Sequence, residues 1–74
     1  MTDEIRLLDV VALVRDLPDH LLVRGQVGTV VEVFGTDTFE IEFSDNHGRT
    51  YALIPVRAED LLVLHNEPVQ TVRP

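Results

Sequence analysis

The sequence predicts an all-β fold, a small and strongly bent five-stranded barrel with a 3₁₀ turn before the last strand. Three observations predict it. Residues 24–34 combine two glycines, three positions apart, with a valine-rich run that favours extended backbone. Residues 38–43 alternate strictly between apolar and polar side chains. Short connections rich in glycine, proline and aspartate separate the apolar runs, which is typical of tight turns between strands.

The first apolar run, residues 7–14, is predicted to be a strand. The run is too short for hydrophobic periodicity to distinguish a strand from a helix. Its valines and the loop signals that follow favour the strand. Asp9 is the polar exception, and it either meets solvent or caps a backbone N–H. Residues 15–20 form a loop, because Pro18 biases Leu17 away from helix. Leu17 is expected to tuck under the barrel.

Gly25 and Gly28 are predicted to shape the turn that leads into the second strand, residues 26–34. Glycine is the residue that turns or bulges the backbone where a Cβ would clash. A bulge near Gly28 is expected to let Val27 and Val30 both face inward, despite their odd spacing.

Residues 35–37 are predicted to be a hairpin turn leading into the clearest strand, residues 38–43. There Phe39, Ile41 and Phe43 face the core, while the polar residues between them face water. A second turn over residues 44–48 leads into a returning strand.

This returning strand covers residues 49–54 and is expected to end at Pro55, which lacks a backbone donor. Residues 56–60 are predicted to form the 3₁₀ turn and residues 61–64 the closing strand. Residues 1–64 thus make one SH3-like barrel with a loose lead-in over 1–5. Residues 65–74 form a tail that is either flexible or pairs as an edge strand. An OB-type barrel is the main competitor, but it needs a helix for which there is no room.

The composition bounds the function. The chain has no cysteine, which excludes a disulfide and a thiolate metal site. Thirteen acidic residues against six arginines give a net charge of −7, which argues against nucleic-acid binding. The charge serves solubility or attracts a basic partner protein. No apolar run is long enough to span a membrane and no secretory signal is evident, so the expected location is the cytoplasm.

No assembled active site is expected. His20, His47 and His65 are scattered over loops, and a metal site would need them to converge with a carboxylate such as Asp19 or Asp45. The run Ser-Asp-Asn-His at 44–47 contains the residue types of a nucleophilic triad, but a tight turn explains the same composition. The prediction is a protein that is not an enzyme, with no catalytic residue, no metal and no cofactor.

SH3-like barrels tend to bind with loops near the first hairpin and with an aromatic side chain on the returning strand. In this sequence that points to five candidate binding residues. An alternative for the aromatic residue, Tyr51, is a core position with its hydroxyl at the rim. The candidates are Asp16, Asp19, His20, Arg49 and Tyr51.

Segments 8–13, 16–18, 24–33, 39–43 and 50–53 together resemble a family of short bacterial proteins known only as a domain of unknown function. The resemblance covers most of residues 7–64. More distantly, residues 24–30 resemble the Gly-x-x-Gly-Thr-Val turn of the nitrile hydratase β subunit and of KOW-type ribosome and transcription modules. These are SH3-like barrels, so the resemblance implies the same fold.

The function expected from these observations is a non-catalytic protein-interaction module, either antitoxin-like or an accessory partner of another bacterial protein. The distant resemblance implies two alternatives, a KOW-like nucleic-acid or ribosome-associated module and an accessory subunit of a nitrile-hydratase-like metalloenzyme. Self-association as a homodimer is also expected, because residues 61–64 and 69–72 offer more apolar surface than a small barrel can bury.

Overall fold

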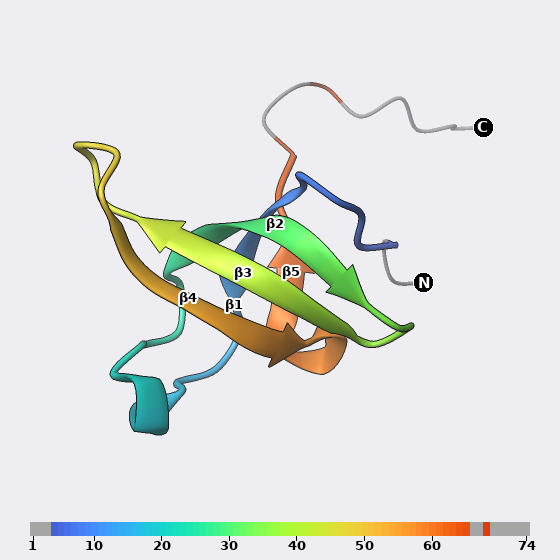
Figure 1. Cartoon of the computed structure of the whole chain (residues 1–74), viewed down its shortest axis with the longest axis horizontal. Helices are drawn as coiled ribbons and strands as arrows, with labels where there is room; N and C mark the ends of the chain where they lie inside the picture. Colours follow the sequence, from blue (N-terminus) through green and yellow to red (C-terminus); the bar gives the residue numbers. More distant parts are fainter. Residues whose placement is uncertain (1–3, 66–67, 69–74) are drawn as a thin grey trace.

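The computed structural model describes residues 4–65 and 68 and contains five antiparallel strands in one sheet of order β4-β3-β2-β1-β5. Figure 1 shows the long strands β2, β3 and β4 in front, with β1 and β5 crossing behind them. A 3₁₀ turn precedes the last strand, as predicted, and the order of elements is consistent with an SH3-like barrel. The elements are β1 (Val10–Leu13), η1 (Pro18–His20), β2 (Val27–Phe34), β3 (Thr38–Ser44), β4 (Thr50–Arg57), η2 (Ala58–Asp60) and β5 (Leu61–Val63).

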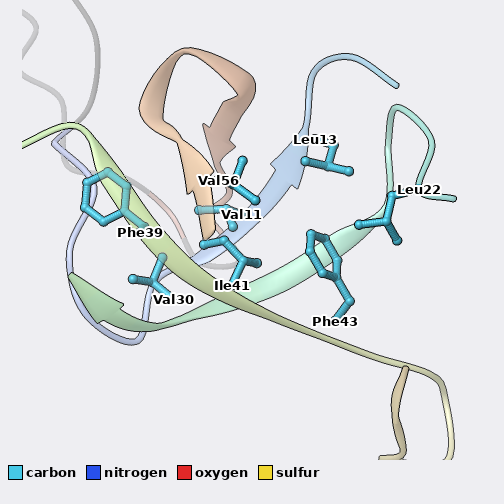
Figure 2. Close-up of a cluster of buried hydrophobic side chains, with 8 residues drawn as sticks. All are labelled: Val11, Leu13, Leu22, Val30, Phe39, Ile41, Phe43 and Val56. Atoms are coloured by element: carbon cyan, nitrogen blue, oxygen red, sulfur yellow. The ribbon is translucent and has the colours of Figure 1, made fainter. Parts of the chain in front are cut away.

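The core lies on the concave side of this bent sheet (Figure 2). Val11 on β1 is opposite Gly28 on β2, which is opposite Phe43 on β3, so these three residues point to one face. Val30 and Ile41 form the next row of the same face. The predicted core positions of β3 are confirmed. Leu17 packs against the core as predicted. The buried residues of the whole core are Val11, Leu13, Leu22, Val30, Phe39, Ile41, Phe43 and Val56.

The bulge in β2 was predicted at the wrong place. It lies between Val30 and Glu32, where the register with β3 shifts. Val27 therefore faces outward and is 45% exposed, whereas Val30 is buried. Gly28 lies inside the strand rather than in the turn. A Cβ there would come within 2.6 Å of Ile41 Cγ2 and 2.8 Å of the Glu42 carbonyl oxygen, so close packing requires the glycine. Gly25 does adopt the turn conformation predicted for it, with φ +94°.

The first strand is shorter than predicted. β1 begins at Val10, and residues 7–8 form a turn that precedes it. Asp9 closes this turn, because its Oδ2 accepts the Arg6 N–H at 2.8 Å. This confirms that Asp9 caps a backbone N–H. The turn also places Leu8 at φ +72°, where its N–H donates to the Val30 carbonyl at 2.7 Å.

Pro55 does not end the fourth strand. β4 begins at Thr50, not Arg49, and runs through Pro55 to Arg57, and the 3₁₀ turn covers only Ala58–Asp60. β4 is an edge of the sheet, so only one of its sides pairs with a neighbour. A residue without an N–H is tolerated there when its nitrogen faces outward. The other edge is β5, and no pairing between β4 and β5 closes the barrel within the part of the chain that the structure describes.

The last strand also ends earlier than predicted. β5 ends at Val63, although the Leu64 N–H still donates to the Val10 carbonyl at 2.9 Å. Apart from residues 65 and 68, the predicted tail lies outside the described residues.

One ion pair joins the loop after β1 to η2. Arg15 Nε lies 2.8 Å from Asp60 Oδ1, but not in hydrogen-bonding alignment, and the Asp60 side chain is only 13% exposed. The Val14 N–H donates to the Asp60 carbonyl at 2.9 Å and joins the same two segments. The pair therefore places a largely buried carboxylate against a guanidinium that reaches water.

Replacing Arg15 by methionine is expected to lower the free energy of unfolding by about 2 kcal/mol, because it leaves the Asp60 carboxylate buried without its cation. Asp60→Asn should cost less, since the arginine can then turn to solvent. Urea denaturation followed by circular dichroism measures both. Arg57→Met is the control, because Arg57 and Glu59 are both largely exposed and 3.9 Å apart. Equal losses for Arg15→Met and Arg57→Met would contradict the expectation.

Candidate functional site

Asp16, the first of the predicted binding residues, has a structural role in its loop. Its Oδ1 accepts the backbone N–H of Arg24 at 2.9 Å, which ties the outgoing and returning parts of the segment between β1 and β2. The segment is closed again nearer its tip, where Leu17 and Leu22 form an isolated antiparallel bridge. Leu22 is buried in the core, so the bridge fixes the loop to the body of the domain.

Tyr51 does not occupy the core position considered as the alternative for it, because it is exposed and outside the core cluster, and its role in binding stays a prediction. Its ring lies 6.2 Å from the ring of buried Phe43, tilted by 41°, and about half of the residue is exposed. Gln26 Nε2 donates to the Tyr51 hydroxyl at 3.3 Å, while Gln26 Oε1 accepts the Val23 N–H at 2.7 Å. Gln26, which the sequence did not single out, therefore connects the loop before β2 to the start of β4. An exposed aromatic ring with a fixed hydroxyl can contact a partner's apolar and polar groups alike.

Asp19 and His20 lie apart from this arrangement. Both belong to η1 at the tip of the loop, and within the described residues no hydrogen bond or ion pair joins them to Arg49 or Tyr51. Next to them Leu21 adopts φ +58° and is 90% exposed. The five candidate residues thus fall on a loop tip, a loop base and the start of β4, and the structure does not gather them into one cluster.

Arg49 and the Asp-Asn-His part of the run at 44–47 belong to the turn between β3 and β4, whereas Ser44 is the last residue of β3. Asp45 Oδ1 accepts the backbone N–H groups of His47 at 2.8 Å and Arg49 at 3.0 Å. Gly48 has φ +79° and its N–H donates to the Asp45 carbonyl. This is the tight turn that explains the composition, with the carboxylate satisfying backbone donors.

Among residues 4–65 and 68, no cluster of three or more histidine, cysteine, aspartate or glutamate side chains is arranged to hold a metal ion. An open hollow of about 260 Å³ lies between the lead-in and the end of β5, with charges of both signs on its wall. It is lined by Glu4, Arg6, Asp9, Val63, Leu64 and His65.

Exposed apolar side chains gather on the outer face of the sheet, and none of them is among the predicted site residues. Ala12 lies opposite Val27 on β2 and Leu62 on β5. Paired residues share a face, and Val11 and Leu13 point to the core, so this row points outward. Val27 is 45% and Leu62 53% exposed. Val10 and Leu64, which are joined by the hydrogen bond between their backbones, extend the row. We call Val10, Ala12, Val27, Leu62 and Leu64 the outer apolar face.

Carboxylates border the outer apolar face on the β3 side. Val10 is opposite Thr29, and Thr29 is opposite Glu42, so one row of the sheet runs from apolar to acidic. Glu32 is directly opposite Glu40 in the neighbouring row. We call Glu32, Glu40 and Glu42 the acidic stripe. The ion pairs within the described residues do not include any of the three, and Glu42 accepts a hydrogen bond from the Thr50 hydroxyl.

The sequence carried a signal for this face. Residues 7–14 are apolar at consecutive positions, which is more than one buried face requires, and residues 61–64 are apolar throughout. Because β1 has apolar side chains on both faces, those of one face pack in the core and those of the other lie at the surface. What the sequence did not show is that β1, β2 and β5 are adjacent and place these side chains together.

Comparison with known proteins finds a matching family model. No curated protein and no solved structure matches the chain significantly. Within the described residues there is also no helix of the length and apolar character that crossing a membrane requires. A family model described as "Domain of unknown function (DUF4926)" matches residues 7–63, which span all five strands. The chain therefore belongs to the DUF4926 family.

Proposed function

We propose that this protein is a non-catalytic protein-interaction module, an antitoxin-like or accessory partner of another protein in the bacterial cytoplasm. The observation that supports the proposal is the outer apolar face. Half-exposed valine and leucine side chains from three adjacent strands lie together there without a charged residue among them, on a chain with a net charge of −7. Contiguous apolar surface bordered by polar groups is typical of protein contact sites.

The hydrogen bonds made by Asp45 and Tyr51 support a binding role rather than a reactive one. The Asp45 carboxylate of the Ser-Asp-Asn-His run accepts two backbone N–H groups of its own turn. Tyr51 and Gln26 give a rigid, half-exposed aromatic position at the base of the first loop. The nucleic-acid role implied by KOW modules is disfavoured by the acidic stripe, which would repel phosphates.

The proposal predicts a partner that is lost when the outer apolar face is made polar. The double substitution Val27→Ser and Leu62→Ser should abolish recovery of a stoichiometric partner from extracts of the source organism, because buried apolar contacts would be lost at the centre of the interface. Affinity capture followed by quantitative mass spectrometry measures this recovery.

The matched control is Leu21→Ser with Val23→Ser, which polarises two side chains of the first loop that are at least as exposed as Val27 and Leu62. The control should retain the partner. Circular dichroism should show both variants folded, since all four side chains are exposed. Capture of no stoichiometric protein, or equal retention by the two double variants, would overturn the proposal. A stoichiometric second copy of the chain instead of another protein would identify the predicted homodimer.

A further inference from the structure

We propose that the outer apolar face docks a cationic protein segment, one that places leucine-like side chains on this face and lysine or arginine side chains on the acidic stripe. This inference rests on the proposed function and names the chemistry of its partner. The apolar face supplies the contact area, and the carboxylates beside it indicate what covers it. Charged groups at the rim of an apolar contact select the partner through complementary potential.

Within the described residues, no arginine forms an ion pair with a carboxylate of the stripe. Glu32 and Glu40 stand directly opposite one another on β2 and β3, an arrangement that destabilises a sheet when both are charged. In the described part of the chain, the ion pairs use Arg6, Arg15 and Arg57, and all three pair elsewhere. The free protein therefore carries a local repulsion that a cationic partner would relieve.

The same charges disfavour a second copy on this face. Two copies would bring two acidic stripes to one interface, and each chain carries a net charge of −7. Like charges brought together cost free energy and slow association. The acidic stripe attracts a basic partner and repels a second copy of the chain. The charge pattern therefore favours a basic partner as the occupant.

Neutralising the facing glutamates in one double variant is expected to have opposite effects on stability and on binding. Neutralising the facing pair with Glu32→Gln and Glu40→Gln should raise the melting temperature of the free protein by about 2–5 °C, because it removes cross-strand repulsion. The same change should weaken binding of a cationic segment about tenfold at low salt, because two rim attractions are lost.

The test uses a fluorescein-labelled amphipathic peptide of leucine and lysine, with a leucine–glutamate peptide of the same pattern beside it, in fluorescence anisotropy at 50 and 300 mM salt. Only the lysine peptide should bind, and more weakly at high salt. The charge-matched control is Asp19→Asn with Glu59→Gln, which also removes two carboxylates, one from each 3₁₀ turn and neither from the stripe. It should change affinity less than about threefold.

The outcomes separate the two proposals. If Val27→Ser with Leu62→Ser leaves peptide binding unchanged, the outer apolar face is not a docking site and the proposed function fails with it. If that variant weakens binding but the Gln double variant weakens it no more than the charge-matched control, only the cationic partner is overturned. Equal binding of both peptides would overturn it as well, as would a dimer in sedimentation velocity that excludes the lysine peptide.

Discussion

Phe43→Ala is expected to lower the free energy of unfolding by about 3–5 kcal/mol, the range for truncating a buried phenylalanine. Phe43 is fully buried, with Gly28 opposite it on one side and Ala52 on the other. Those small neighbours cannot fill the space left by the ring. A core of this size supplies only about 3–5 kcal/mol of net stability. The variant should therefore be largely unfolded at 25 °C, as measured by circular dichroism and urea titration.

Phe34→Ala is the matched control. Phe34 lies at the end of β2 with 41% of its surface exposed, so truncation removes fewer contacts and should cost about 1–2 kcal/mol. If this variant stays folded at 25 °C while the Phe43 variant unfolds, burial explains the difference. Comparable losses in the two variants would show that the ring of Phe43 is not the centre of the core.

The second large effect is expected from the smallest possible addition, Gly28→Ala. The new Cβ would lie 2.8 Å from the Glu42 carbonyl oxygen and 2.6 Å from Ile41 Cγ2. The oxygen belongs to the backbone of the neighbouring strand and the Ile41 side chain is buried, so neither can move without displacing β3. The cost should reach the upper end of the about 1–3 kcal/mol typical of overpacking, measured by urea denaturation.

The control for this substitution is Gly48→Asn. A Cβ at Gly48 meets nothing within 4 Å, and asparagine is among the residues that accept its φ of +79°. The free energy of unfolding should stay within about 0.5 kcal/mol of wild type. A Gly28→Ala variant as stable as the Gly48→Asn variant would mean that β2 and β3 can separate locally without loss, contrary to the packing described.

The elements that could be predicted from the sequence are those decided by local patterns. Alternation placed Phe39, Ile41 and Phe43 correctly in the core, because side chains of one strand alternate between faces whatever the strand pairs with. The elements that could not be predicted depend on pairing. Pro55 ends a strand only if both sides must be hydrogen-bonded, and its position on an edge removes that requirement.

The same distinction explains the errors in β2 and in the candidate site. Val27 and Val30 are indistinguishable by residue type, and only the register with β3 shows that the bulge follows Val30 and that Val27 faces outward. Gln26 donates to the Tyr51 hydroxyl and Asp16 accepts the backbone N–H of Arg24, and a list of residue types reveals neither contact. The outer apolar face is assembled from β1, β2 and β5, strands that are separated in the chain by loops and by two further strands.

The two edges of the sheet have a consequence for how this molecule meets others in a crowded cell. One border is interrupted by Pro55, which offers no hydrogen to an incoming chain, and the other is only three residues long. Neither border is a good template for adding strand after strand, so the valine-rich ribbon is protected from growing into fibrils. Other proteins are therefore expected to bind to a face of the sheet rather than to an edge, and binding to a face can stop at a single partner.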